Sequence, residues 1–209
     1  WTFHLRDGLK FHDGKELTSE DVKFTLEAIL DKKNNSEIVS NYQDITNITC
    51  QDKKTVVIKL SKENVAFADY MTIGILPKHL LKGKKLATAE FNQKPVGAGP
   101  YKLTSWDEGK KFDGYYAGKP NIKKIIFKIV EDSDARLLQL KSGDLDMAQI
   151  EPKQAKSLEK DSKDFDIYRM NTADYRAIAY NYAGSKLFKT YPELANILSY
   201  GIDREAIIK

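Results

Sequence analysis

Residues 95–152 constrain the fold most, because they combine a glycine-rich turn, an alternating apolar run and a well-marked helix. In 125–129, isoleucine and phenylalanine alternate so that one face of a strand would be covered. A helix is predicted directly afterwards, with Asp132 as its N-cap and Gly143 at its end. The segment 144–148 is predicted to be a further strand. The order strand, helix, strand indicates a βαβ unit with a parallel strand pair, and therefore the α/β class.

The glycines of the turn, Gly97 and Gly99, raise the question of a phosphate-binding loop. Such a loop needs a strand before it and a helix N-terminus after it, because the helix amides hold the anion. Here Pro100 and Tyr101 follow and begin a predicted strand. We therefore interpret the glycines as a tight turn where the chain passes between lobes.

The first part of the chain predicts a small α+β lobe. Residues 1–6 alternate as a strand with one buried face, and 45–49 and 55–60 are predicted to form a hairpin of two strands. A helix is predicted from Thr18, with Asp21 three residues later in a near capping box. Its apolar side is formed by Val22, Leu26, Ile29 and Leu30.

Four motifs carry a resemblance to a known family. They are WTFHLRDGLKFHDGKELTSEDVKFTLEAIL (1–30), PVGAGPYKLTSW (95–106), YYAGKPNIKKIIFKIVEDSDARLLQLKSGDLDMA (115–148) and LSYGIDREAII (198–208). In this order they resemble the extracellular solute-binding proteins of peptide-type ABC importers, a family that includes oligopeptide-, dipeptide- and nickel-binding proteins. The resemblance implies a periplasmic-binding-protein-like fold (type II, cluster C), with two lobes and mixed β-sheets.

The resemblance also implies a division of the chain. Residues 1–94 correspond to a small α+β accessory lobe, 95–190 to part of the first large α/β lobe, and 191–209 to the start of the second large lobe. Family members are well over twice as long, and the first residues already lie within a predicted strand. The chain is therefore expected to be an internal portion of a longer protein.

The stretch NTADYRAIAYNY, residues 171–182, is the predicted place of ligand contact. By resemblance it lines the cleft, with Asn171, Asp174, Tyr175 and Arg176 as the candidate ligand-binding residues. Asp174 and Arg176 would pair with the charged ends of a peptide, while Tyr175 and the backbone flank it. The alternative is an ordinary edge strand with a solvent-facing salt bridge.

The function implied is capture of oligo- or dipeptides and their delivery to membrane permease subunits, outside the cell or in the periplasm. A lipid anchor on the longer protein is expected, no cofactor is implied, and an orphaned apolar lobe face would favour self-association. Nickel chelates, oligosaccharides and other small solutes are alternative ligands, because related proteins carry them.

Composition leaves few other functions open. The formal net charge is +4, from 34 basic and 30 acidic residues, and the lysines are dispersed, which argues against a nucleic-acid partner. No apolar run is long enough to cross a bilayer.

His12 and Asp13 have no third ligand at a useful spacing and are interpreted as turn residues rather than a metal site. The single Cys50 has no basic neighbour that would activate it and is interpreted as a small, half-buried residue.

Two other classes of protein remain as alternatives. A secreted hydrolase would use carboxylate pairs, of which Asp132 with Asp134 and Asp144 with Asp146 are examples. Helix capping explains the first pair and a turn explains the second. No nucleophile, base and orienting group stand out together, so no enzyme is predicted. A surface adhesion domain would equally lack catalytic residues.

Overall fold

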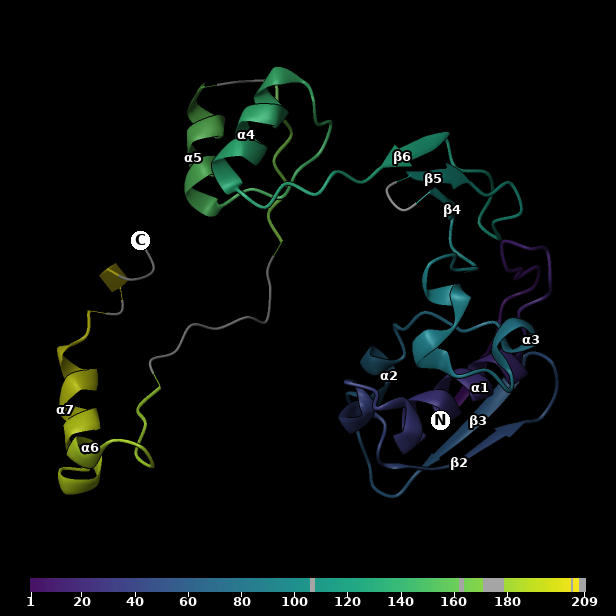
Figure 1. Ribbon diagram of the computed structural model, residues 1–209, viewed down its shortest axis with the longest axis horizontal. Coiled ribbons are helices and arrows are strands. Elements are labelled where there is room, and N and C mark those ends of the chain that lie inside the picture. Colours follow the sequence, from purple (N-terminus) through teal and green to yellow (C-terminus); the bar gives the residue numbers. More distant parts are fainter. Residues whose placement is uncertain (106–107, 162–163, 171–178, 204, 207–209) are drawn as a thin grey trace. The chain divides into compact units, whose positions relative to one another are not determined.

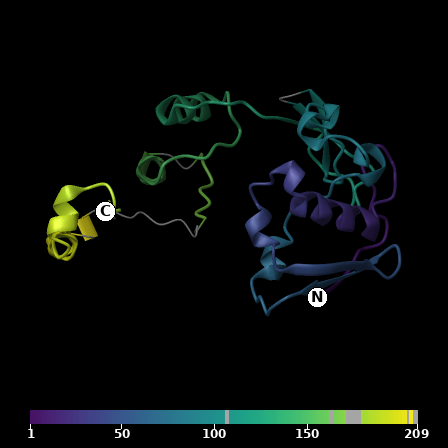
Figure 2. The ribbon, with the colours of Figure 1, turned by 60° about the horizontal axis from the view of Figure 1, so that its bottom comes forward.

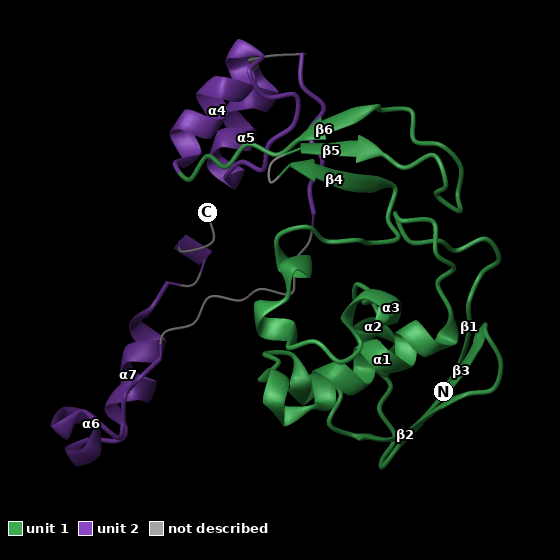
Figure 3. Cartoon of the chain, turned by 45° about the vertical axis from the view of Figure 1, so that its right-hand side comes forward, with its two compact units in different colours: residues 1–131 green, residues 132–209 purple. Residues whose placement is uncertain are grey.

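The computed structural model describes residues 1–105, 108–161, 164–170, 179–203 and 205–206 (Figure 1). The chain forms two compact units, residues 1–131 and 132–209 (Figure 3). The lobe boundaries after residues 94 and 190 stay predictions. Among the described residues, no helix combines the length and the apolar character that crossing a bilayer requires.

The first unit begins with an antiparallel sheet. It contains β1 (Thr2–His4), β2 (Ile45–Cys50) and β3 (Thr55–Leu60) in the order β1-β3-β2. β-branched residues dominate β3, where Val56 and Ile58 are fully buried and Lys59 is exposed. The predicted strands and the hairpin turn between them are confirmed.

One face of this sheet is covered by helix α1 (Ser19–Leu30), drawn in purple above the strands in Figure 2. The predicted capping box is present, because the Asp21 carboxylate accepts a hydrogen bond from the Thr18 amide at 2.9 Å. Val22 and Leu26 are buried, and Ile29 and Leu30 pack against the same core at partial exposure. The predicted apolar side of the helix is confirmed.

Short helical turns complete this part of the unit. They are 3-10 turns at Lys32–Asn34, Val39–Asn41, Leu86–Thr88 and Glu90–Asn92, and the helices α2 (Phe67–Tyr70) and α3 (Lys78–Leu81). Tyr42 and Phe67 close the core beside α1, with ring centroids 6.4 Å apart. The Tyr42 hydroxyl donates to the carbonyl of Tyr70, so this large side chain is both packed and hydrogen-bonded.

A second sheet follows in the same unit. It contains β4 (Tyr101–Ser105), β5 (Glu108–Lys111) and β6 (Lys124–Ile126), paired antiparallel in chain order. The strand predicted to run through 129 ends at Ile126. Phe127 and Ile129 are 67% and 91% exposed, so the prediction that 125–129 covers one face is wrong for these two residues.

The helices α4 to α7 belong to the second unit. They are α4 (Ser133–Ser142), α5 (Pro152–Asp161), α6 (Lys186–Thr190) and α7 (Leu194–Gly201). The Asp132 carboxylate accepts a hydrogen bond from the Ala135 amide at 2.7 Å, and Gly143 ends α4 at a φ of 81°, which glycine adopts without steric cost. Both predicted ends of α4 are confirmed.

The predicted strand at 144–148 is wrong. The amides of Asp144 and Leu145 donate to the carbonyl of Gln139 at 2.9 and 3.1 Å, so they close the end of α4 instead of pairing with a strand. Every strand pair among the described residues is antiparallel, and the predicted parallel βαβ pair is therefore wrong. Residues 165–170 form no strand either.

Candidate functional site

The four predicted ligand-binding residues cannot be placed from the structure. Asn171, Asp174, Tyr175 and Arg176 all lie within 171–178, outside the described residues. Their role in ligand contact stays a prediction.

The end of the same sequence stretch is described, and its aromatic residues pack locally. The rings of Tyr180 and Tyr182 lie 5.3 and 5.7 Å from the ring of Phe188 in α6. The Tyr182 hydroxyl donates to the carbonyl of Pro192 at 3.3 Å, and the Tyr180 hydroxyl lies 3.4 Å from Oγ of Ser199 in α7. These tyrosines therefore pack and hydrogen-bond the segment around 180–182 against α6, Pro192 and α7.

A shallow, charged depression of about 400 Å³ lies in the first unit. The first turn of α1 forms part of its wall, together with Lys15, Glu16, Lys78, His79 and Lys82. A binding site needs polar groups that are still available to a ligand, so the partners of these side chains decide whether the depression can serve as one.

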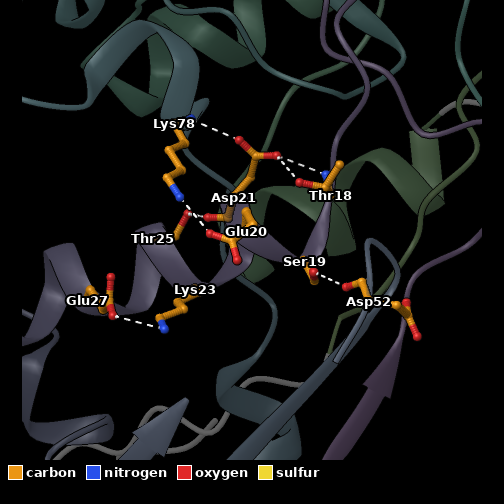
Figure 4. Close-up of polar contacts among 9 residues, drawn as sticks. All are labelled: Thr18, Ser19, Glu20, Asp21, Lys23, Thr25, Glu27, Asp52 and Lys78. Carbon is orange, nitrogen blue, oxygen red and sulfur yellow. Dashed lines mark hydrogen bonds and ion pairs between the residues drawn. The ribbon is translucent and has the colours of Figure 1, made fainter. Parts of the chain in front are cut away.

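Asp21 forms the centre of the hydrogen-bond network beside this depression (Figure 4). Its side chain is largely buried and accepts hydrogen bonds from the Thr18 amide, the Thr18 hydroxyl and the Lys78 amide at 2.9, 3.0 and 2.9 Å. The Thr25 hydroxyl donates to the Asp21 carbonyl at 2.8 Å and accepts from the Leu76 amide at 2.9 Å. Residues 76–78 are thereby tied to α1, and the polar groups buried there are satisfied within the chain.

The other carboxylates of the depression are also engaged. Glu20 Oε2 lies 2.6 Å from Lys78 Nζ, and Glu16 lies 3.4 Å from Lys53. The hydrogen bond from Lys78 lowers the pKa of Glu20, and the same bond raises the pKa of Lys78. The arrangement serves mainly to join segments of the fold, since its carboxylates already have partners.

Two histidines, His12 and His79, join the turn at 11–15 to distant parts of the first unit. His79 Nε2 lies 2.6 Å from Asp13 Oδ2. Partial burial acts to raise the pKa of Asp13, but the hydrogen bonds from His79 and from the Lys15 amide act to lower it. The net effect is a lowered pKa for Asp13. His12 instead contacts Gly97 and Gly99, 85 and 87 residues away. No group of three or more metal-ligating side chains occurs among the described residues. His12 and Asp13 lie in a turn, as predicted, but their distant partners were not foreseen.

The remaining candidates for chemistry have structural roles. Asp132 caps α4, Asp134 accepts a hydrogen bond from the Gln154 side chain at 2.8 Å, and Asp144 accepts one from the Ser142 hydroxyl at 3.1 Å. Cys50 is half-buried as predicted, and its burial raises the pKa of the thiol, which disfavours the nucleophilic thiolate.

Comparison with known protein families gives one match over the whole chain. Residues 1–209 match the family described as "Bacterial extracellular solute-binding proteins, family 5 Middle". The chain belongs to this family. The resemblance inferred from the four motifs is confirmed.

Curated relatives of this family-5 chain include peptide-binding proteins. It is 31% identical to the oligopeptide-binding protein AppA of Bacillus subtilis over 98% of its length, and 30% identical to the glutathione-binding protein GsiB of Escherichia coli over its whole length. It covers 39% and 42% of those proteins. The chain thus spans about two-fifths of the length of the curated relatives that it matches.

Solved structures of family-5 proteins show the same fold. NikZ of Campylobacter jejuni, in complex with Ni(L-His), matches the whole chain with a TM-score of 0.88 at 36% identity, and the match covers 43% of NikZ. AppA of Bacillus subtilis, in complex with a nonapeptide, matches 76% of the chain with a TM-score of 0.70 at 31% identity, and the match covers 34% of AppA. The predicted fold class, part of a two-lobe periplasmic-binding-protein-like fold, is confirmed.

Proposed function

We propose that this chain is part of the solute-binding component of an ABC importer, and that the complete protein captures peptides and delivers them to a membrane permease. The observation that carries the proposal is the family match along residues 1–209. Peptides are preferred as the solute because curated relatives are an oligopeptide-binding and a glutathione-binding protein, and glutathione is itself a small peptide.

A nickel chelate is the second candidate solute. NikZ, which was solved with Ni(L-His), matches the whole chain, whereas AppA with its nonapeptide matches three-quarters of it. An extended peptide and a compact chelate need different contacts, so binding data separate the two candidates directly.

The proposed mechanism is capture without catalysis. The two lobes of the complete protein would close around the solute by hinge motion, and the closed form would be recognised by the permease. A solute favours closure only by the difference between its affinities for the closed and open states. Action outside the cell or in the periplasm, with a lipid anchor, belongs to the same proposal.

Asn171, Asp174, Tyr175 and Arg176 are proposed to contribute to the cleft. Asp174 and Arg176 have the charges needed to pair with the amino and carboxyl ends of a peptide, and such charge-assisted pairs are stronger than neutral hydrogen bonds. Main-chain hydrogen bonds would hold the rest of an extended ligand independently of its sequence.

Thermal unfolding of the protein in its complete natural form tests this proposal. Separate samples would receive mixed di- to penta-peptides, a nonapeptide, Ni(L-His) and oligosaccharides, because a solute that binds only the native state raises Tm. We expect a rise with peptides, and a rise with Ni(L-His) alone would favour the second candidate. No rise with any solute would contradict solute capture.

A matched pair of variants tests the cleft residues. Arg176→Ala is expected to reduce the peptide-induced rise in Tm. Arg169→Ala serves as the control, because the Arg169 guanidinium pairs with Glu159 at 2.6 Å within the second unit. An equal reduction in both variants would contradict a specific role for Arg176.

Self-association is a separate proposal. It is supported by the exposed apolar side chains of Phe127 and Ile129. Analytical ultracentrifugation over a range of concentrations tests it, and a constant monomer mass would contradict it.

A further inference from the structure

A single histidine side chain connects two segments that are far apart in the sequence. His12 lies in the turn at 11–15, and its ring contacts the glycine-rich segment 94–100. The Gly97 amide donates to His12 Nδ1 at 3.2 Å, and His12 Nε2 lies 3.0 Å from the carbonyl oxygen of Gly99. The His12 amide adds a hydrogen bond of 2.8 Å to the Gly97 carbonyl.

The two ring contacts require one particular form of the imidazole. A backbone amide can only donate, so His12 Nδ1 must accept and carries no proton. A carbonyl can only accept, so Nε2 must carry the proton that is donated to Gly99. The neutral tautomer with the proton on Nε2 satisfies both contacts, whereas the other neutral tautomer satisfies neither.

Packing around the ring supports the same arrangement. The His12 ring meets the ring of Phe112 edge to face, with centroids 5.1 Å apart, and the Phe112 amide donates to the carbonyl of Pro100 at 2.8 Å. A Cβ placed on Gly97 would lie 3.4 Å from His12 Cε1, a contact at the tight end of the ordinary range. The segment therefore lies within van der Waals distance of the imidazole.

We propose that His12 is a positioning residue that latches segment 94–100 onto the turn at 11–15. Strand β4 begins at Tyr101, directly after this segment, so the latch fixes the point from which the second sheet starts. The core of the first sheet is formed by other residues, among them Val56 and Ile58.

Hydrogen exchange at the Gly97 amide tests the latch in the complete natural protein. Loss of one hydrogen bond is expected to speed exchange of this amide about tenfold in His12→Ala. His12→Asn is expected to retain most of the protection, because the asparagine side-chain oxygen can take the place of Nδ1. His4→Ala is the matched control, since His4 contacts Thr55 and not the segment.

Three outcomes of that experiment would overturn the latch. The first is unchanged exchange at Gly97 in His12→Ala, and the second is equal acceleration in His4→Ala. The third is an equal acceleration at Ile58, a core amide of β3 that donates to the Trp1 carbonyl at 2.8 Å, because His12 would then act only on global stability.

The tautomer gives a further readout. The nitrogen-15 resonances of His12 are expected to show a protonated Nε2 and an unprotonated Nδ1, and the reverse assignment would overturn the proposed contacts.

Discussion

Replacement of Asp21 by alanine tests how the first unit is held together. The substitution removes the acceptor of three hydrogen bonds, from the Thr18 amide, the Thr18 hydroxyl and the Lys78 amide. A capping interaction contributes about 1 kcal/mol, and a donor left without a partner costs about 1–3 kcal/mol. Because these terms overlap and water reaches part of the site, we expect a loss of about 2–4 kcal/mol.

Native-state hydrogen exchange at Ile58 measures this loss for the first unit alone, without assuming that both units unfold together. A loss of about 2–4 kcal/mol corresponds to exchange that is about 30 to 700 times faster. Asp21→Asn keeps one acceptor and should fall between alanine and wild type. Glu20→Gln is the matched control, because the Glu20 side chain is exposed and its ion pair with Lys78 contributes less than about 1 kcal/mol. If Asp21→Ala accelerates exchange no more than Glu20→Gln does, the hydrogen bonds accepted by Asp21 do not stabilise the first unit.

Three further predictions concern the core, the end of α4 and one carboxylate. Leu26→Ala should lower the free energy of unfolding by about 2–5 kcal/mol, measured by exchange at the Ile58 amide, because Leu26 is fully buried. Leu138 is 68% exposed, so Leu138→Ala should change the exchange of the α4 amides little. Equal effects of the two substitutions would contradict the core assignment. Gly143→Ala should destabilise α4 by about 1 kcal/mol, because the φ of Gly143 is 81° and alanine adopts this angle only with strain. Faster hydrogen exchange of the α4 amides is the expected result, and unchanged exchange would refute the prediction. The pKa of Glu20 is lowered in the folded chain, so its contribution to stability is fully present above the ordinary glutamate value of about 4.3 and is lost as the pH falls through the lower folded value. Lys78→Met should raise the pKa of Glu20, as followed by NMR titration, and an unmoved pKa would refute the pairing.

Local signals in the sequence predicted the elements that local interactions determine. The capping box at Thr18 and Asp21, the N-cap at Asp132 and the glycine end at Gly143 each depend on residues within a few positions, and all three are confirmed. The family also followed from short motifs, which the comparison with family models confirmed over the whole chain.

Long-range pairing was predicted less well, because a strand depends on a partner that one sequence does not reveal. Residues 144–147 alternate polar and apolar side chains as a strand does, but the amides of Asp144 and Leu145 are used to close α4. His12 gave no signal of its contact with Gly97, since 85 residues separate them. The candidate ligand residues were predicted from the resemblance and from the chemistry of their side chains, and they lie outside the described residues.

Isothermal titration of the complete natural protein with a nonapeptide, with Ni(L-His) and with an oligosaccharide is the most direct test of peptide capture. We expect saturable binding of one peptide per protein molecule, weakened by Arg176→Ala and not by Arg169→Ala. Saturable binding of Ni(L-His) alone would keep solute capture and replace the peptide by a chelate. The absence of saturable binding with all three solutes would contradict solute capture.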